Sequence, residues 1–538
     1  MIESEPWSYH ADGTPVTSLA DVIRKRAAAT PDGVALSRAG QVTTFADIDA
    51  RSSQAAAALR NAGVVAGDRV AFIGASGPAF AEVMYATAKC GAIFSAVNNR
   101  LARPEVLAVL EDAEPRVVVA DADSGWIAAA AADFGFRCTV LVTGAAGQAA
   151  DAGRSYEAHR DAALPADPGA TAGPDDTALI LYTSGTTGLP KGVELTGRNL
   201  GCALRELHAG IGLDERSVCA APIPFFHISG LGLLLAANLN GSQLLLDQVT
   251  DTPGLLQFLT SRRVTHAAVV PTVLQRLLAL PEAATADWSA LSHIVYGASP
   301  IPLPVLRAAV DVIGCSFVQS YGLTESTGGF TLLGPADHAP GEEVAHRLRS
   351  AGRPMAGARV RVVDPDTLQD RAPGERGEVL VAGSRVMKGY WRKPEQTAEV
   401  MLPGGWLRTG DGGSFDADGF LYLHDRLKDM LISGGENVYP AEVESVLTGH
   451  PAVAEVAVVG VPSDRWGESP YAVVVLRPGA EVTEGELIGW SRERLAHFKC
   501  PVGVSFAAEL ARTASGKLRK QAIRAALPES LVTVAGSS

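Results

Sequence analysis

Strand-like and helix-like segments alternate along most of this chain, and this alternation constrains the fold more than any other feature. Short apolar runs predict buried strands at Arg69–Gly74, Val117–Ala120 and Thr139–Val142. Leu19–Ala29 and Phe45–Ala62 have the periodicity of helices. Repeated strand–helix units are typical of parallel sheets covered by helices, in which ligands bind at the carboxyl ends of the strands.

The same alternation resumes after residue 192. Short strands broken by Gly and Pro between Gly352 and Tyr422 predict an antiparallel piece, and after Asp425 the pattern is that of a compact α+β unit. Between residue 192 and Gly352, the predicted helices include Leu255–Arg262 and Val305–Val312. The predicted strands in this part of the chain are Val218–Ile223, Ser242–Leu246, Thr265–Val270, His293–Tyr296 and Ser316–Gln319.

The expected fold class is therefore α/β. It comprises a large N-terminal domain of parallel, helix-covered sheets with a small antiparallel piece, followed by an α+β C-terminal domain. A chain of 538 residues exceeds what one hydrophobic core fills, which also favours more than one domain. We place the boundary between residues 1–425 and residues 426–538.

Composition narrows the class of partner and compartment. A net charge of −13 argues against a nucleic-acid surface, which needs a concentrated basic face. Six cysteines are scattered without the short spacings of a zinc site, so we expect free thiols in a reducing compartment. The acidic N-terminus lacks an apolar signal region, and the richest apolar run, Leu231–Leu239, is too short to span a membrane. We therefore expect a cytoplasmic protein without an integral membrane segment.

A loop rich in hydroxyl groups follows the predicted strand Ala178–Leu181. Residues Tyr182–Gly192 contain four Ser or Thr hydroxyls, three glycines and one lysine. Glycines let backbone N–H groups turn toward an anion, hydroxyls add donors, and Lys191 supplies a charge, so the loop suits a polyphosphate. The spacing is not the Walker pattern, because Pro190 precedes the lysine and a glycine follows it. An ordinary polar turn is the alternative, but so many donors beside a lysine favour the phosphate site.

Four further segments carry polar residues suited to the same chemistry. In Gln319–Ser326, after a predicted strand, Tyr321 can stack on a base, Thr324 can donate to a phosphate and Glu325 can hold Mg²⁺. A Thr-Glu pair after a strand is otherwise typical of a helix N-terminus. The other candidates are Asp411, Arg426 and Lys517, each of which would singly be a turn or surface residue.

Taken together and in this order, these segments resemble the adenylate-forming superfamily of acyl-CoA synthetases, adenylation domains and beetle luciferases. The resemblance covers about Leu19 to Leu527, with five separate matches at the family's spacing. Gly434–Glu444 and Val461–Gly467 are most similar to the acyl-CoA synthetase and fatty-acid–CoA ligase branch. The resemblance implies an AMP-forming enzyme that uses ATP, Mg²⁺ and coenzyme A and whose C-terminal domain is a mobile lid.

In the first step that the resemblance implies, a carboxylate attacks the α-phosphate of ATP and gives acyl-AMP and pyrophosphate. Lys517, Thr324 and Glu325 would be catalytic, with Mg²⁺ on Glu325 and the Lys517 ammonium offsetting charge at the α-phosphate. Tyr321 would stack on adenine, and Asp411 and Arg426 would hold the ribose. The residues implied in ATP or AMP binding are Thr183, Ser184, Gly185, Thr186, Thr187, Gly188, Lys191, Gly297, Ala298, Ser299, Gln319, Ser320, Tyr321, Gly322, Asp411 and Arg426.

In the second implied step, the thiol of coenzyme A attacks the acyl carbonyl and expels AMP. The resemblance places the hinge of the C-terminal domain at Lys428, and rotation there would withdraw Lys517 from the site. Trp466 is equally well interpreted as a half-buried packing residue and as an aromatic contact for coenzyme A. Cys500 stands where some relatives carry a basic residue, so no nucleotide contact is assigned to it. The residues implied in coenzyme A binding are Ser433, Gly434, Gly435 and Trp466.

Pro224–Gly230 matches the segment that lines the acyl pocket of the family. The resemblance places His227 at the carboxylate-binding end with a catalytic role, whereas a His beside two aromatic residues is otherwise a core residue. Phe226, Leu231 and Val270 are the predicted pocket walls, and as apolar residues they are equally suited to a core. Nothing resembles the acidic residue that holds an α-ammonium group, so a fatty, aryl or alicyclic acid is favoured over an amino acid.

The leading interpretation is a carboxylic acid–CoA ligase whose partner is a small-molecule acid, and a homodimer is a candidate assembly. Three alternatives stay open. A stand-alone adenylation enzyme would load a carrier protein instead of coenzyme A. A ligase specialised for one half-reaction would keep the same motifs. A nucleotide-binding protein that no longer catalyses is the alternative from another functional class.

Overall fold

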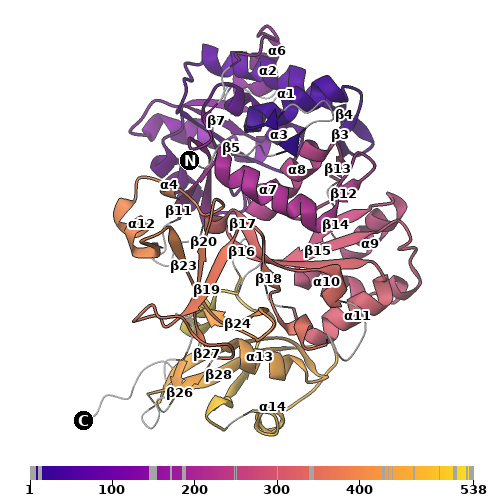
Figure 1. The fold of residues 1–538 in the computed structure, drawn as a ribbon, viewed down its shortest axis with the longest axis vertical. Helices are drawn as coiled ribbons and strands as arrows, with labels where there is room; N and C mark the ends of the chain where they lie inside the picture. Colours follow the sequence, from indigo (N-terminus) through magenta and orange to yellow (C-terminus); the bar gives the residue numbers. More distant parts are fainter. Residues whose placement is uncertain are drawn as a thin grey trace. The chain divides into compact units, whose positions relative to one another are not determined.

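The structure is a computed structural model, drawn as a ribbon in Figure 1. The chain divides into two compact units. The first contains Met1–Ala298, Ala308–Val360 and Val381–Leu407, and the second contains Ser299–Arg307, Arg361–Leu380 and Arg408–Ser538. The predicted boundary at residues 425 and 426 stays a prediction. The structure describes residues 8–9, 15–144, 154–169, 172–183, 190–247, 249, 251–299, 301–338, 345–426, 431–433, 436–438, 440–463, 467–495, 497–512, 518–528 and 531.

Within the described residues, the first unit contains an eight-stranded sheet. Six of its strands form a parallel run, and two further strands join one edge through successive antiparallel pairings. In order across the sheet, the strands are β21 (Gly389–Tyr390), β11 (Lys191–Thr196), β10 (Thr177–Thr183), β6 (Ile93–Val97), β5 (Arg69–Ile73), β7 (Val117–Ala120), β8 (Thr139–Val142) and β9 (Arg154–Ser155).

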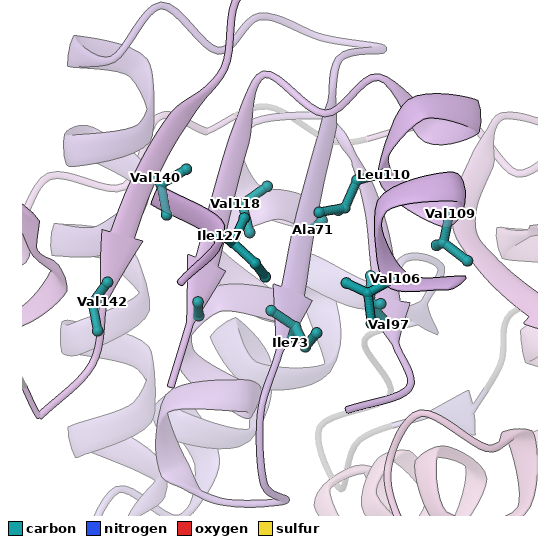
Figure 2. Close-up of a cluster of buried hydrophobic side chains, with 11 residues drawn as sticks. Ala71, Ile73, Val97, Val106, Val109, Leu110, Val118, Ile127, Val140 and Val142 are labelled. Carbon is teal, nitrogen blue, oxygen red and sulfur yellow. The ribbon is translucent and has the colours of Figure 1, made fainter. Parts of the chain in front are cut away.

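One face of this sheet packs on helix α4 (Arg103–Ala113) and the short helix α5 (Ile127–Ala130), as Figure 2 shows. Ala71 and Ile73 of β5 join the same buried cluster because side chains two residues apart lie on one face of a strand. Val118, Val140 and Val142 continue the cluster along β7 and β8. These valine-rich strands are buried along their length, as expected of a parallel sheet covered on both faces.

The opposite face carries aromatic side chains that meet helix α3 (Pro78–Lys89). The Phe80 ring lies edge to face against Phe72 of β5 and Phe94 of β6, at centroid distances of 5.2 and 5.1 Å. Helices α1 (Leu19–Ala29) and α2 (Phe45–Asn61) pack with α3 to complete this layer.

The other large sheet of the first unit has nine strands among the residues described. Its central strands are parallel, and both edges are antiparallel. In order, the strands are β18 (Arg353–Pro354), β17 (Gly328–Leu333), β16 (Ser316–Leu323), β15 (His293–Gly297), β14 (His266–Val269), β12 (Val218–Ala220), β13 (Gln243–Leu245), β3 (Val34–Arg38) and β4 (Gln41–Thr44). The helices along this part of the chain are α7 (Gly197–Ile211), α8 (Ile228–Asn240), α9 (Thr252–Ser261), α10 (Pro271–Leu278) and α11 (Leu303–Ile313).

Antiparallel strands follow, as the sequence predicted after Gly352. Strand β23 (Trp406–Phe415) pairs with β24 (Leu421–Arg426) and with β22 (Met401–Leu402). The same sheet contains β19 (Arg359–Val363) and β20 (Gly377–Ala382). Helix α12 (Pro394–Val400) interrupts this region and was not predicted.

The C-terminal part of the second unit contains a sheet that is antiparallel except for the pair of β28 (Gly467–Leu476) and β29 (Val504–Phe506) and that has apolar side chains on both faces. Along β27 (Val453–Ser463), Val456 and Val458 belong to one buried cluster while Ala457 and Val459 belong to another. Its other elements are β25 (Leu431–Ser433), β26 (Glu436–Val438), α13 (Pro440–Thr448), α14 (Glu484–Arg492) and α15 (Lys520–Ala525).

The expected fold class is confirmed, since large parallel sheets with helices precede a smaller antiparallel sheet. No disulfide joins the six cysteines, all of which lie in the described part of the chain; Cys138 and Cys315 are half-buried and the others are buried. Among the helices that the structure describes, none is long and apolar enough to cross a membrane.

Candidate active site

The hydroxyl-rich loop joins two paired strands of the eight-stranded sheet. Strand β10 ends at Thr183, which lies opposite Lys191, the first residue of β11. Both ends of the loop are therefore held at one register position, at the carboxyl end of β10. The predicted phosphate-binding residues within the loop, Ser184, Gly185, Thr186, Thr187 and Gly188, lie outside the described residues.

Lys191 faces an aromatic residue that also reaches the predicted metal ligand. Its Nζ lies 5.0 Å from the centroid of the Tyr390 ring, in the geometry of a cation–π contact. The Tyr390 hydroxyl donates a 3.1 Å hydrogen bond to Glu325 Oε1. Strand β21 places Tyr390 there, because Tyr390 lies opposite Val193 of β11. The structure thus connects the predicted phosphate lysine and the predicted metal carboxylate through one tyrosine.

Glu325 sits in a short 3₁₀ turn, Thr324–Ser326, between β16 and β17. The Ser326 hydroxyl accepts from the Leu323 N–H at 2.9 Å and donates to the Gly328 carbonyl at 2.8 Å. Thr327 then adopts the left-handed conformation, with φ of 54°. The strands approach closely here, since a Cβ on Gly322 would lie 2.0 Å from the Gly328 oxygen.

A buried arginine fixes the same turn from behind. Arg385 Nε donates to the Ser326 carbonyl at 3.2 Å, and the Thr327 hydroxyl donates to the Arg385 carbonyl at 2.6 Å. The guanidinium also pairs with Glu206 of α7, whose Oε1 accepts the Gly357 N–H at 2.6 Å. Burial lowers the pKa of Arg385, and the charge of Glu206 acts in the opposite direction. The turn that presents Glu325 is therefore anchored to a buried ion pair.

The predicted adenine-side residues meet at the ends of two neighbouring parallel strands. Gly297 of β15 pairs with Ser320 of β16, and a Cβ on Gly297 would lie 2.2 Å from the Ser320 oxygen. Ala298, which follows, has a φ of 66°. The Tyr321 ring lies edge to face on Phe330, 4.8 Å between centroids. Gln319, Ser320, Tyr321 and Gly322 are consecutive on β16 and lie beside Gly297, whereas Ser299 belongs to the second unit.

The predicted acyl-pocket segment lies at the N-terminus of α8. His227 is the N-cap residue, and its ring centroid lies 4.5 Å from that of Phe226. A Cβ on Gly328 would lie 3.8 Å from Ile228 Cγ1, which places the start of α8 beside the start of β17. Val270 follows β14 directly, and Leu231 is fully buried. The histidine segment and the Glu325 turn therefore flank the same end of β17.

The predicted ribose-binding pair lies in the second unit. Asp411 and Arg426 occupy one register position of the β23–β24 hairpin. Asp411 is buried, and its N–H donates to the Thr409 hydroxyl at 3.1 Å. Two residues assigned to ribose from separate motifs are thus cross-strand neighbours.

Ser433 of β25 pairs with Gly467 of β28 in the second unit. This pairing brings together the two chain segments that were predicted to bind coenzyme A, because Gly434 and Gly435 follow Ser433 and Trp466 precedes Gly467. Gly434, Gly435 and Trp466 themselves lie outside the described residues, as do Lys428 and Lys517. The segment that contains Lys517 is flanked by a bridge between Arg512 and Leu518.

Comparison with known proteins decides the family. Residues 23–391 match the AMP-binding enzyme family, and residues 442–517 match the AMP-binding enzyme C-terminal domain. The chain belongs to the AMP-binding enzyme family. The predicted resemblance to the adenylate-forming superfamily, in its acyl-CoA synthetase branch, is thereby confirmed.

Relatives of this AMP-binding enzyme match it over nearly their whole length. A feruloyl-CoA synthase of Amycolatopsis sp is 39% identical over 93% of this chain and 97% of its own. The fatty acid–[acyl-carrier-protein] ligase ScoC of Streptomyces coeruleorubidus is 35% identical over 90% and 92%. The solved o-succinylbenzoate CoA synthetase (MenE) of Bacillus subtilis, in complex with the acyl-adenylate OSB-AMP, has a TM-score of 0.81 at 32% identity, covering 93% and 97%.

Sequence reasoning missed three side chains that support the site of this AMP-binding enzyme: Tyr390, Arg385 and Glu206. Arg385 and Tyr390 lie in a glycine-containing apolar stretch, and Glu206 lies on an amphipathic helix, where each is an ordinary residue for its local pattern. A weak signal was available, because Arg385 is a lone charge between Val379–Ala382 and Val386–Met387. A charge among apolar residues predicts a buried partner but does not say which one.

Proposed function

We propose that this chain is a carboxylic acid–coenzyme A ligase. It forms acyl-AMP from a hydrophobic acid and ATP, and then passes the acyl group to the thiol of coenzyme A. The observation that carries the proposal is the contact of Tyr390 with both Lys191 and Glu325. In an AMP-binding enzyme, this contact groups a cation for the phosphates with a carboxylate for a metal ion.

In the first step, a carboxylate oxygen of the acid bonds to the α-phosphorus of ATP, and the bond from that phosphorus to the bridging oxygen breaks. Lys191 would bind the phosphates together with the loop hydroxyls, and Thr324 would donate to the α-phosphate. Lys517 would offset the charge that develops as pyrophosphate leaves. Removal of one such aimed donor typically costs roughly 3–4 kcal/mol of transition-state stabilisation.

Glu325 fits a magnesium site of the kind found beside nucleotides. Its carboxylate is half-buried and oriented by Tyr390. The described part of the chain contains no group of three or more His, Cys, Asp or Glu side chains that could hold a metal ion. One carboxylate with phosphate oxygens and water is the usual ligand set of Mg²⁺ in nucleotide enzymes, so we propose that Glu325 would hold Mg²⁺ with the phosphates. The ion would neutralise charge on the phosphates when bound.

In the second step, the sulfur of coenzyme A bonds to the acyl carbonyl carbon and its thiol proton is lost, while the bond from that carbon to the phosphate oxygen breaks and AMP leaves. Ser433, Gly434, Gly435 and Trp466 would border the thiol's path. Their segments are neighbours because Ser433 pairs with Gly467. Lys428 would be the hinge about which the C-terminal domain moves between the steps.

The acid is proposed to be hydrophobic, with aryl acids as the first candidates. Phe226 and Ile228 flank His227, and Ile228 reaches the start of β17 beside the Glu325 turn. The relatives named for feruloyl and o-succinylbenzoyl groups act on acids with aromatic rings. His227 would contact the carboxylate, with Phe226, Leu231 and Val270 as walls of the pocket.

A screen of carboxylic acids with ATP, Mg²⁺ and coenzyme A tests the proposal, with AMP and thioester measured separately. The expected result is that an aryl or fatty acid yields equal amounts of AMP and acyl-CoA. Chelation of divalent cations with EDTA is expected to stop AMP formation, and excess Mg²⁺ is expected to restore it. Absence of AMP with every acid would contradict the proposed reaction.

One alternative has a specific observation in its favour, namely the similarity to a ligase named for acyl-carrier protein. The same screen with a carrier protein in place of coenzyme A separates the two. Transfer to the carrier alone would replace the coenzyme A proposal. Cytoplasmic location and a homodimer remain predictions.

A further inference from the structure

A chain of hydrogen bonds runs behind the predicted adenine-binding strand. His338 Nδ1 lies 2.8 Å from the Gly334 carbonyl, and His338 Nε2 lies 2.9 Å from the Tyr296 hydroxyl. The Tyr296 oxygen in turn lies 3.3 Å from Oε1 of Gln319. Tyr296 and His338 are 1% and 4% exposed, whereas Gln319 is half-buried. These hydrogen bonds therefore connect buried residues of the core to Gln319 at the candidate site.

The Gly334 carbonyl lies at one end of this series of hydrogen bonds, and it determines which atom is the donor in each of them. A carbonyl can only accept, so His338 Nδ1 carries the hydrogen. Burial lowers the pKa of His338, so the ring is neutral near pH 7 and Nε2 is left as an acceptor. The Tyr296 hydroxyl must then give its one hydrogen to His338 Nε2. Only lone pairs of the Tyr296 oxygen remain to face Gln319.

This leaves a specific requirement for the Gln319 carboxamide. With Oε1 toward Tyr296, two acceptors would face each other at 3.3 Å. A half-turn about the last side-chain bond brings the amide NH₂ to Tyr296 and gives every group a partner of the opposite kind. The amide oxygen is then turned away from Tyr296 and is available as an acceptor.

Gln319 lies where such an acceptor would meet a base. It pairs with Tyr296 across the strands, and the next register pair is Ser320 with Gly297. Gln319 and Tyr321 are two residues apart on β16, so they lie on the same face of the sheet. Tyr321 is the residue proposed to stack on adenine.

We propose that Tyr296 and His338 orient the Gln319 amide so that its oxygen accepts from the 6-amino group of adenine. The two buried residues thereby select a 6-amino purine over a 6-oxo purine. This inference rests on the proposed use of ATP. Inosine presents an oxygen at the same position, so binding ITP would leave two acceptors facing each other, which costs the desolvation of both.

Binding of ATP and of ITP, measured by calorimetry without an acid substrate, tests the inference in the full-length chain. The unmodified protein is expected to bind ATP roughly 10–100 times more tightly than ITP, the range expected for one unpaired polar contact. Gln319→Leu is expected to abolish most of this preference. Tyr296→Phe is expected to reduce it at least about fivefold, and the double variant to reduce it no further than Gln319→Leu alone.

His338→Leu gives a sharper outcome that a merely structural role would not produce. Without the His338 acceptor, the Tyr296 hydroxyl is free to donate to Gln319 Oε1, which turns the amide NH₂ toward the base. The ratio of ATP affinity to ITP affinity should then be lower in His338→Leu than in Tyr296→Phe. Phe317→Leu is the matched control, because its ring packs near Tyr296 and His338, at 6.4 and 6.1 Å, without a polar atom. Phe317→Leu should lower the stability of the protein and leave the ratio of ATP affinity to ITP affinity unchanged.

Equal binding of ATP and ITP by the unmodified protein would overturn the inference. The inference would also be overturned if both Tyr296→Phe and His338→Leu left the ratio of ATP affinity to ITP affinity unchanged. If Tyr296→Phe does not fold, His338→Leu alone decides the test. If the binding pattern is found but no acid yields AMP, the inference on base selection stands and the proposed ligase reaction fails.

Discussion

At the scale of single residues, Tyr390 connects two predicted site residues, Lys191 and Glu325. Its ring offers a negative face to the Lys191 ammonium, and its hydroxyl donates to the Glu325 carboxylate. Lys191 and Glu325 were predicted from motifs, but Tyr390 was not, because its role follows from strand pairing and not from its neighbours in sequence. The orientation of the carboxylate proposed to bind the metal ion thus depends on a residue outside the motifs.

Tyr390→Phe is expected to lower kcat for adenylation roughly tenfold, the effect of one lost hydrogen bond to a charged group, and to raise the Mg²⁺ concentration at half-maximal rate. The ring stays over Lys191, so stability should change little. AMP formation at increasing Mg²⁺ concentrations measures both effects. Tyr422→Phe is the control, because it loses a matching 3.1 Å bond to the Asp416 carboxylate in the second unit. An identical Mg²⁺ dependence in the two variants would contradict the role of Tyr390.

His424 provides a test of burial in the β23–β24 hairpin. Burial lowers the pKa of His424 to about 4, with Arg376 and Lys499 acting in the same direction and Glu442 opposing them. The unfolded chain has a His pKa of about 6.5, so it binds more protons than the folded state between these values. The contribution of His424 to stability is therefore full above about pH 6.5 and is lost as the pH falls toward 4.

His424→Gln should consequently flatten the loss of stability between pH 7.5 and pH 5, by ~2 kcal/mol at the lower pH. Urea unfolding at the two pH values measures this difference. His497→Gln replaces an exposed histidine of the same unit and should leave the slope as it is. A slope unaltered in His424→Gln would mean that other groups carry the acid sensitivity.

At the scale of elements, segments with strong local patterns were predicted well. Helix α1 begins at Leu19 and ends at Ala29 as predicted, and the Ser18 side chain caps it by accepting the Asp21 N–H. Strand β12 ends at Ala220 and not at Ile223, because Pro222 cannot donate to a strand ladder. Strand β16 continues past Gln319 to Leu323 because it also pairs with β17. The local sequence pattern does not predict this pairing.

The turn at Glu325 shows why the support of the site was not predictable. Arg385 and Glu206 are 179 residues apart in the sequence and meet only through folding. Their side chains are 2% and 11% exposed, so neither charge can be left alone without a large cost. The motif predicted Glu325, whereas the long-range pair decides how the turn around it is held.

Arg385→Met is expected to destabilise the protein by about 3–5 kcal/mol, because it leaves Glu206 buried without its cation. Adding Glu206→Leu should recover much of the stability, whereas adenylation should stay low in both variants because the Ser326 carbonyl has lost its donor. Urea unfolding and AMP formation measure the two effects. Arg198→Met, which breaks the exposed pair with Asp175, should cost less than about 1 kcal/mol. A similar cost for both arginines would show that the buried pair is not an anchor.

At the scale of the whole molecule, the proposed reaction draws on both compact units. Lys191 and Glu325 belong to the first unit, and Asp411, Arg426 and Lys517 belong to the second. The boundary predicted from the sequence instead places Asp411 in the N-terminal domain and Arg426 and Lys517 in the C-terminal domain, and that boundary stays a prediction. Under the proposed function, the two half-reactions should therefore respond differently to changes in the second unit.

Lys517→Ala should abolish acyl-AMP formation but spare thioester formation from supplied acyl-AMP, because its charge is needed only at the α-phosphate in the first step. Single-turnover assays of each half-reaction measure this separation. Lys520→Ala, which removes a nearby lysine paired with Glu444 at 2.9 Å, is the control and should affect neither step strongly. Equal loss of both steps in Lys517→Ala would refute the assignment.

The register pair of Thr183 and Lys191 has a consequence for how such an enzyme can change. Because paired strands fix both ends of the loop, the pairing itself does not dictate which residues occupy positions 184–189. Closing a longer loop costs little, about 0.6 kcal/mol for each doubling of length. The segment between these two residues can therefore change in length and sequence at little cost to the stability of the sheet that holds its ends.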